Sequence, residues 1–208
     1  MEVSLLERHA LNIADTHGCH TVILYGSRAR GDATESSDVD VLCVRDTGPP
    51  ARDARLIAGT YFDVFICSTS GIETPDSSLL KLRGGRVLRE RDRLGAILLR
   101  RVQELHDRGP EPLSSDERTA RILWGHKTLD RIRAGRGPDT DYRRMFLRVQ
   151  ALEDYFALRT AWFRGSREAL AWLKQHDVNA YDAFAIAMRR AASDEDIAAL
   201  VLSVYGAL

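Results

Sequence analysis

The spacing of hydrophobic positions changes near residue 110. Before that point, apolar residues recur at helical spacing over residues 3–16 and again over residues 91–107. Between these helices the apolar residues gather in four short runs, at residues 21–25, 38–44, 60–67 and 86–89. Short runs rich in β-branched and aromatic residues, bounded by glycine and polar turns, predict strands. The first half therefore predicts a region of mixed helices and strands.

The second half carries only helical patterns. Gly109, Pro110 and Pro112 end the preceding helix, and Ser114 with Glu117 forms a capping-box pattern that starts the next. The predicted helices cover residues 114–134, 140–163, 166–176, 179–191 and 194–207. We therefore expect two domains, residues 1–110 with an α+β fold and residues 114–208 as an all-α helical bundle.

Charge and composition exclude several classes of protein. The chain has 208 residues with 30 basic and 30 acidic side chains, so no global charge predicts nucleic-acid or membrane binding. No apolar run is long enough to span a bilayer, and the acidic, amphipathic N-terminal segment does not have the pattern of a signal peptide. Three cysteines without metal-ligand spacing predict buried thiols in a reducing compartment. We expect a cytoplasmic protein.

Two aspartates interrupt the apolar run at residues 38–44. Asp38 and Asp40 project from the same face of the predicted strand, while Val39 and Val41 project from the other, toward a core. Like charges this close repel unless a cation lies between them, and oxygen ligands without Cys–His pairs favour Mg²⁺ over zinc. Asp63 repeats the pattern in the run at residues 60–67. The alternative is an exposed edge strand with solvated aspartates.

A glycine turn precedes this pair of aspartates. Gly26 ends the run at residues 21–25, and Ser27 opens the polar segment "SRARGD". Backbone N–H groups at a tight turn that leads into a helix favour an anion, and Ser27 with Arg28 or Arg30 adds donors and charge. An anion cradle near a pair of metal-binding carboxylates predicts a metal–polyphosphate site, as used in phosphoryl or nucleotidyl transfer.

The stretch "LYGSRARGDATESSDVDVLCV" resembles the G-S-x10-D-x-D signature of the DNA polymerase β-like nucleotidyltransferase superfamily, with a third aspartate on a later strand. The resemblance implies a polymerase β-like α+β domain followed by a helical bundle. It also implies two Mg²⁺ ions held by Asp38, Asp40 and Asp63, and a Gly26-Ser27 turn that binds the β- and γ-phosphates of a nucleoside triphosphate, expected to be ATP. The helical half is more loosely similar to bundles of bacterial enzymes that adenylylate aminoglycosides or lincosamides.

The resemblance also suggests residues for acceptor and phosphate binding. Lys127, on the first helix of the bundle, could contact the triphosphate, as such lysines do in related enzymes; the alternative is a solvated helix face. An acceptor hydroxyl needs a base, and Glu153, Asp154 or Asp63 could provide it. For Glu153 and Asp154 the alternative is the charged face of an ordinary amphipathic helix.

The sequence leaves the acceptor open. A small hydroxyl-bearing molecule such as an aminoglycoside is the first candidate, because the chain has no charge excess for a polyanion. The alternatives are tRNA or a protein partner in a toxin–antitoxin pair. A non-catalytic nucleotide-binding module is a further alternative, although this chain keeps the acids and the Gly-Ser turn that such relatives usually lose. An apolar face of the bundle could also form a homodimer.

Overall fold

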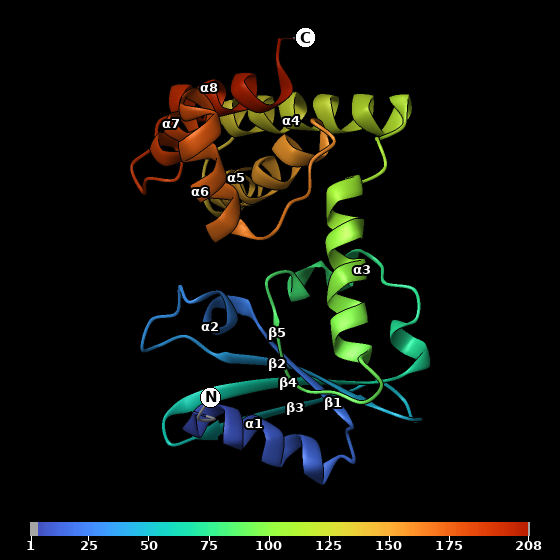
Figure 1. Ribbon diagram of the computed structural model, residues 1–208. Helices are drawn as coiled ribbons and strands as arrows, with labels where there is room; N and C mark the ends of the chain where they lie inside the picture. The colour runs from blue at the N-terminus through green and yellow to red at the C-terminus, as the bar shows by residue number, and fades with distance from the viewer. Residues whose placement is uncertain (1–3, 208) are drawn as a thin grey trace. The chain divides into compact units, whose positions relative to one another are not determined.

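The computed structural model describes residues 4–207 (Figure 1). Its contacts divide the chain into two compact units, unit 1 ending at Arg108 and unit 2 beginning at Gly109. Unit 1 mixes helices with a sheet, and unit 2 is helical. The prediction of an α+β region followed by helices is therefore confirmed. In the described part of the chain, no helix combines the length and the apolarity needed to cross a membrane.

Unit 1 is built on one five-stranded mixed sheet with the order β3-β4-β2-β1-β5. Strand β2 runs parallel to β4, and the other neighbours are antiparallel. The strands are β1 (Thr21–Tyr25), β2 (Val39–Arg45), β3 (Ala51–Ile57), β4 (Thr60–Ser68) and β5 (Arg86–Arg89). Four of them begin and end within one residue of the predicted runs; β3 is the exception.

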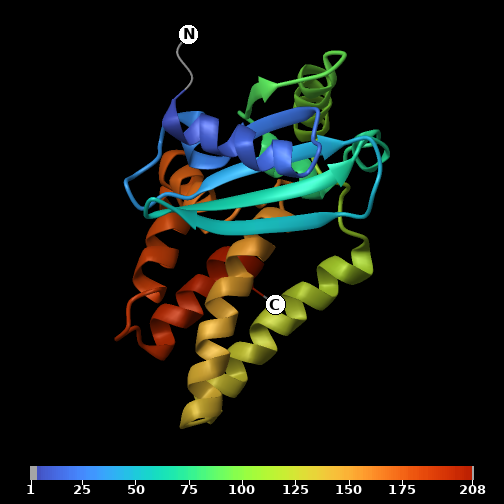
Figure 2. The ribbon, with the colours of Figure 1, turned by 90° about the horizontal axis from the view of Figure 1, so that it is seen from below.

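Helices cover both faces of the sheet. Helix α1 packs on one face, and α3 packs on the other together with the 3₁₀ segment η2 (Figures 1 and 2). The helical segments of unit 1 are α1 (Leu5–Thr16), α2 (Gly26–Arg30), η1 (Ser70–Ile72), η2 (Ser77–Leu82) and α3 (Leu94–Arg108). A sheet covered on both faces needs strands that are apolar on both sides, which explains the continuous apolar runs in the sequence.

Strand β2 shows this two-sided burial. Val39 and Val41 belong to the core beneath α1, as predicted, and Leu42 and Val44 belong to the core beneath α3. Asp40 points to the same side as Leu42 because side chains alternate along a strand. It is the one charged residue inside this strand's apolar run, and it lies near the end that follows the loop from α2.

The sequence pattern does not predict β3. Most of its residues are exposed, and Arg52, Asp53 and Arg55 give it no apolar face. The strand lies at the edge of the sheet and pairs only with β4. Charged edge strands protect a sheet from pairing with other chains. Its stability comes from backbone pairing, which a hydrophobic pattern cannot reveal.

Unit 2 consists of helices packed around a single apolar core. Its helices are α4 (Ser115–Ala134), α5 (Pro138–Ala157), α6 (Ser166–His176), α7 (Val178–Ala187) and α8 (Asp194–Tyr205). The predicted capping box is formed, since the Ser114 hydroxyl accepts from the backbone of Glu117 and the Glu117 carboxylate accepts from the backbone of Ser114. Helices α4 and α5 pack side by side (Figure 2).

Helix α5 ends earlier than predicted. It stops at Ala157 instead of continuing to residue 163. Thr160 adopts a positive φ of 52°, and the Ala161 N–H donates to the Phe156 carbonyl at 2.9 Å. The Arg159 guanidinium also reaches the Tyr155 carbonyl at 3.1 Å. No glycine or proline marks this turn in the sequence, so the periodic pattern extends past the true end.

Candidate functional site

The turn after β1 brings the backbone against the carboxylate of Asp40. Gly26 has a φ of 73°, in the left-handed region that favours glycine. A Cβ atom on Gly26 would lie 2.3 Å from the Oδ2 atom of Asp40. Ser27 lies in the first turn of α2. The residue at the N-cap of this helix, Tyr25, makes no side-chain hydrogen bond to the backbone N–H groups of that turn. Both the conformation and the space require glycine here, so the predicted turn and Asp40 lie together.

Asp40 and Asp63 are direct partners in the register of the parallel strands β2 and β4. Neighbouring strands lie about 4.8 Å apart, so the side chains of paired residues on the same face of the sheet are adjacent. Asp38 immediately precedes β2 and is exposed. Burial raises the pKa of Asp40, and the charges of Asp63 and Asp38 raise it further. The structure therefore places Asp63 and Asp38 close enough to Asp40 to raise its pKa, an effect that the charges of Lys81 and Arg30 offset only in part.

Two cations that the sequence did not single out lie beside these acids. Arg52 of β3 donates from Nε and Nη2 to the two carboxylate oxygens of Asp63, at 2.6 and 2.7 Å. Lys81 of η2 places its Nζ atom 3.5 Å from the centre of the Phe65 ring. Burial lowers the pKa of Lys81, while the charges of Asp63 and Asp40 oppose that shift. The site is thus a charged cluster of both signs.

Carboxylate oxygens are the ligands that Mg²⁺ prefers, and the unfavourable surroundings of ionised Asp40 suit a bound cation. Within residues 4–207, however, no three acidic, imidazole or thiol groups are arranged around a common metal position. Asp63 is engaged by Arg52 through both oxygens. Asp38, Asp40 and Asp63 therefore stay a predicted ligand set for a divalent cation, and binding by all three would require Asp63 to exchange Arg52 for the metal.

Arg28 serves the loop that leads to the aspartates. Its Nε and Nη2 atoms donate to the Ser37 carbonyl at 3.0 and 2.6 Å, and Nε also reaches the Asp38 carbonyl at 3.2 Å. In the same loop, the Thr34 N–H donates to the Ser37 hydroxyl at 2.8 Å. These bonds hold the backbone in front of Asp38. The predicted contact between Arg28 and a phosphate stays a prediction, and it would compete with them.

The second-half candidates belong to unit 2. Lys127 is exposed on α4, and its contact with a triphosphate stays a prediction. Glu153 is exposed on α5. Because both side chains are exposed, each can also belong to an ordinary solvated helix face.

Asp154 has surroundings unlike those of a free base. Its side chain is 1% exposed. Its carboxylate accepts hydrogen bonds from the Tyr205 hydroxyl at 2.8 Å and the Gln150 amide at 3.1 Å, and it pairs with Arg121. A buried carboxylate whose oxygens are occupied by these partners contributes to the stability of the fold. We therefore assign Asp154 to the interior of the bundle.

The missed residues left little signal in the sequence. Arg52 lies on the unpredicted strand β3, and Lys81 lies in a short 3₁₀ segment between two strands. Their positions depend on which strands are neighbours in the sheet, and in particular on β3 pairing with β4. The one sequence signal for Lys81 is its residue type, since the chain has three lysines and is rich in arginine.

Residues 12–84 match the model of a family described as nucleotidyltransferase domain. This range contains the Gly26 turn, the three aspartates and Lys81. Among solved structures, the chain is similar to the crystal structure of a nucleotidyltransferase-like protein from Exiguobacterium sibiricum 255-15, with 11% sequence identity and a TM-score of 0.48. The similarity covers 96% of this chain and 73% of that chain. The comparison with curated proteins gives no match.

Proposed function

Because residues 12–84 match the model of a nucleotidyltransferase domain, we propose that the chain transfers AMP from ATP to a hydroxyl group of an acceptor and releases pyrophosphate. The observation that carries this proposal is the pairing of Asp40 and Asp63 on adjacent parallel strands beside the Gly26 turn. A non-catalytic nucleotide-binding module would not need this cluster of acids. The three free cysteines are consistent with a cytoplasmic enzyme.

The nucleotide would bind where the acids and the turn meet. Mg²⁺ held by Asp38, Asp40 and Asp63 would neutralise the triphosphate and align the reacting groups. The Gly26-Ser27 turn would donate its backbone N–H groups and the Ser27 hydroxyl to phosphate oxygens. Lys81, whose ammonium lies over the Phe65 ring near Asp40 and Asp63, would add a positive charge on the same side of the sheet.

In the chemical step, the acceptor oxygen forms a bond to the α-phosphorus as the bond from that phosphorus to the β-phosphate oxygen breaks. Pyrophosphate leaves with the bonding electron pair. The hydroxyl proton passes to a carboxylate, and Asp63 is the best placed, since its side chain lies beside Asp40 on the adjacent strand. Arg52, which now binds both Asp63 oxygens, would have to release one of them for this role.

A cavity in unit 2 supports a small molecule as the acceptor. Unit 2 contains a cavity of about 500 Å³ with aromatic walls from Trp124 and Phe146, whose ring centres are 5.8 Å apart. Gln150 and Glu117 add polar groups to the same cavity. This size and this mixture of aromatic and polar lining are typical of sites for small organic molecules. A hydroxyl-bearing compound of the aminoglycoside class would fit that description.

The test is a transfer assay with α-labelled ATP, GTP, CTP and UTP in the presence of Mg²⁺. Each nucleotide is offered a panel of aminoglycosides and lincosamides, bulk tRNA and a cell lysate. We expect label from ATP to move to a small molecule. Label that moves instead to tRNA or to a protein would replace the acceptor class and keep the transfer activity.

The control is the double variant Asp38→Ala/Asp40→Ala, checked for folding by circular dichroism. It should lose transfer to every acceptor. Transfer that continues unchanged in this folded variant would sink the proposal. Nucleotide binding without transfer to any acceptor would support the non-catalytic alternative.

A further inference from the structure

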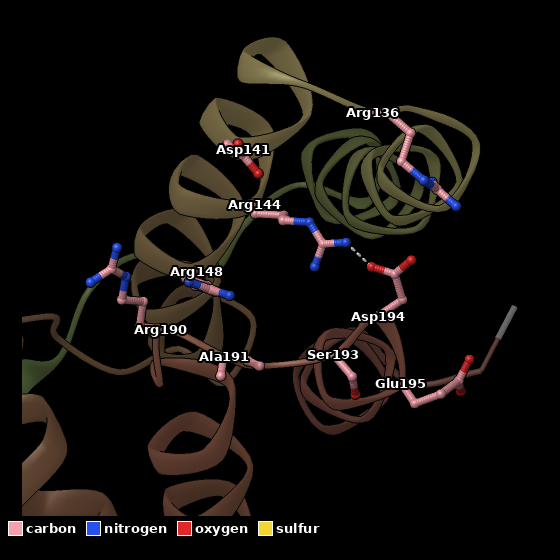
Figure 3. Close-up of a pocket in the computed structure, with 10 residues that line it drawn as sticks. Arg136, Asp141, Arg144, Arg148, Arg190, Ala191, Ser193, Asp194 and Glu195 are labelled. Carbon is pink, nitrogen blue, oxygen red and sulfur yellow. Dashed lines mark hydrogen bonds and ion pairs between the residues drawn. The ribbon is translucent and has the colours of Figure 1, made fainter.

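Unit 2 contains a second, larger cavity that the proposed reaction does not use. It has a volume of about 870 Å³ and is lined by ten residues, four of which are arginines (Figure 3). Arg136 comes from the α4–α5 connection, Arg144 and Arg148 from α5, and Arg190 from the segment after α7. In Figure 3, Arg144 and Arg148 extend from α5 toward the chain that carries Ala191 to Asp194. Segments distant in sequence thus bring their arginines to one cavity.

Four arginines and three acids line this cavity, so the arginines exceed the acids by one charge. Asp194 is paired with Arg144, and Glu195 faces Arg133, which does not line the cavity, at 3.4 Å. Asp141 is the remaining acid of the lining, and of the remaining arginines Arg136 donates to the carbonyls of Arg133 and Gly135. The charge of the cavity is therefore positive.

Among the described arginines of this cavity, Arg148 has a buried donor without a partner. Its Nε atom is buried and has no hydrogen-bond partner among the described residues. Burial lowers the pKa of Arg148, and the neighbouring charge of Arg144 lowers it further. A buried N–H donor without an acceptor destabilises the fold. A bound anion would supply both the missing acceptor and the missing charge.

The N-terminus of α8 does not account for this positive character. Ser193 and Asp196 already form its capping box. Asp194 and Glu195 occupy the same first turn, so acids compensate the helix dipole there. Attraction for an anion in this cavity must come from the arginine side chains.

We propose that this cavity is a binding site for a small oligophosphate. A guanidinium group can bind two phosphate oxygens at once through parallel N–H donors. The ammonium group of lysine is a point charge and does not make this paired contact. Arg144 and Arg148 are four residues apart on α5, so their side chains project from the same face on successive turns. The cavity volume exceeds what a single phosphate fills and is within the range of sites for nucleotide-sized ligands.

This site is separate from the proposed nucleotide site of unit 1, and it does not depend on the transfer reaction. Inorganic tripolyphosphate is the probe, because it carries the proposed chemistry without a base or sugar. The measurement follows the Nε–Hε signals of arginine in ¹⁵N-labelled full-length protein by NMR, with EDTA present to exclude divalent cations. The Arg148 signal is assigned by its absence from the Arg148→Gln variant.

We expect tripolyphosphate to shift the Arg148 signal in a saturable manner, and citrate at equal concentration to shift it much less. Calorimetry should show that Arg148→Gln weakens binding about tenfold, as expected for losing a charge-assisted contact. Arg190→Gln, at an exposed position, should weaken it by a smaller factor. The matched control is Arg143→Gln, since Arg143 is adjacent on α5 but pairs with Asp139 and does not line the cavity.

Two outcomes would overturn the proposal. One is an Arg148 signal that does not move at saturating tripolyphosphate, or a citrate shift as large as the phosphate shift. The other is a shift that disappears in the Ser27→Ala variant, because the phosphate would then belong to the nucleotide site of unit 1. Arg190→Gln keeps the test decisive if Arg148→Gln does not fold.

Discussion

Asp40 in unit 1 and Asp154 in unit 2 are both carboxylates withdrawn from solvent, but their partners differ. Asp154 is 1% exposed and receives hydrogen bonds from Tyr205 and Gln150 together with an ion pair from Arg121. Asp40 is half-buried, and its strongest electrostatic neighbours are Asp63 and Asp38, both of the same sign. The fold gives Asp154 a close ion-pair partner, whereas the charges of Lys81 and Arg30 near Asp40 are outweighed by burial and by its acidic neighbours.

This difference separates structural from functional acids. A buried charge is stable when the fold itself provides donors and an opposite charge. Where the fold instead gathers like charges around a glycine turn, the missing countercharge must come from a ligand. By this criterion Asp154 stabilises the bundle, and we propose Asp40 as a ligand for a metal that accompanies a nucleotide.

The largest expected effect follows from removing the charge of Asp40. Asp40→Asn should lower nucleotidyl transfer about 10³-fold, because the metal and its phosphates lose a ligand. The free energy of unfolding should stay the same or rise, since the substitution also removes like-charge repulsion. Steady-state kinetics and urea unfolding measure the two quantities on the same protein sample.

The matched control is Asp46→Asn. Asp46 lies one residue beyond the other end of β2 and is exposed. This substitution should change neither turnover nor unfolding by a comparable amount. A loss of stability in Asp40→Asn without a loss of turnover would reverse our assignment of the two carboxylates.

Asp154→Asn should show the opposite behaviour. Breaking the buried pair leaves Arg121 without its partner, so unfolding should become easier by about 3 kcal/mol. Urea denaturation monitored by circular dichroism gives this value, and Glu153→Gln, at the exposed neighbouring position, serves as the control. If Asp154→Asn were as stable as the natural chain, the carboxylate would not be a structural anchor.

A third compensated carboxylate sharpens the comparison through pH. The Arg55 guanidinium, followed by His17, lowers the pKa of Asp53 to about 2 from its ordinary 3.8. A lowered pKa stabilises the fold above the ordinary value, and this contribution is lost as pH falls from about 4 through about 2.

Asp53→Asn should therefore cost about 1–2 kcal/mol near neutral pH, with solvent at Arg55 reducing the effect. The difference from the natural chain should shrink as the pH falls below about 4. Thermal unfolding across this pH range measures it, with Asp182→Asn, exposed on α7, as the control. A difference that grows toward low pH would contradict the assigned direction.

Asp63 lies between the two extremes, because Arg52 compensates it while Asp40 remains beside it. Arg52→Gln should strengthen binding of a divalent cation several-fold, because a competing positive charge is removed. The check is Mn²⁺ binding followed by electron paramagnetic resonance. Arg55→Gln, on the same strand but paired with Asp53, should leave the affinity unchanged.

Much of the sheet could be predicted because its central strands are buried on both faces. The apolar runs around Ile23 and Leu42 are continuous because both faces of these strands are buried. Glycine or polar segments mark the ends of the runs. The start of α4 could be predicted for a different reason, because the hydrogen bonds of the capping box at Ser114 join residues that are close in sequence. Features that depend on neighbours in sequence are readable from the sequence.

Features that depend on neighbours in space were not readable. Strand β3 is held by backbone pairing to β4, and its charged side chains show no periodic pattern. The Arg52–Asp63 pair requires that strand, and Lys81 reaches the acids only through a short 3₁₀ segment. Arg28 could be predicted to be near the turn, but its bonds to the Ser37 carbonyl depend on how the loop folds back.

We propose that Asp40, whose acidic neighbours and burial outweigh the nearby charges of Lys81 and Arg30, binds a divalent cation. The most direct test is a Mn²⁺ titration of the natural chain, Asp40→Asn and Asp46→Asn by electron paramagnetic resonance, with and without a non-hydrolysable ATP analogue. We predict saturable Mn²⁺ binding that the analogue strengthens, that Asp40→Asn weakens at least about tenfold, and that Asp46→Asn preserves. Equal Mn²⁺ affinity in all three proteins would contradict the account.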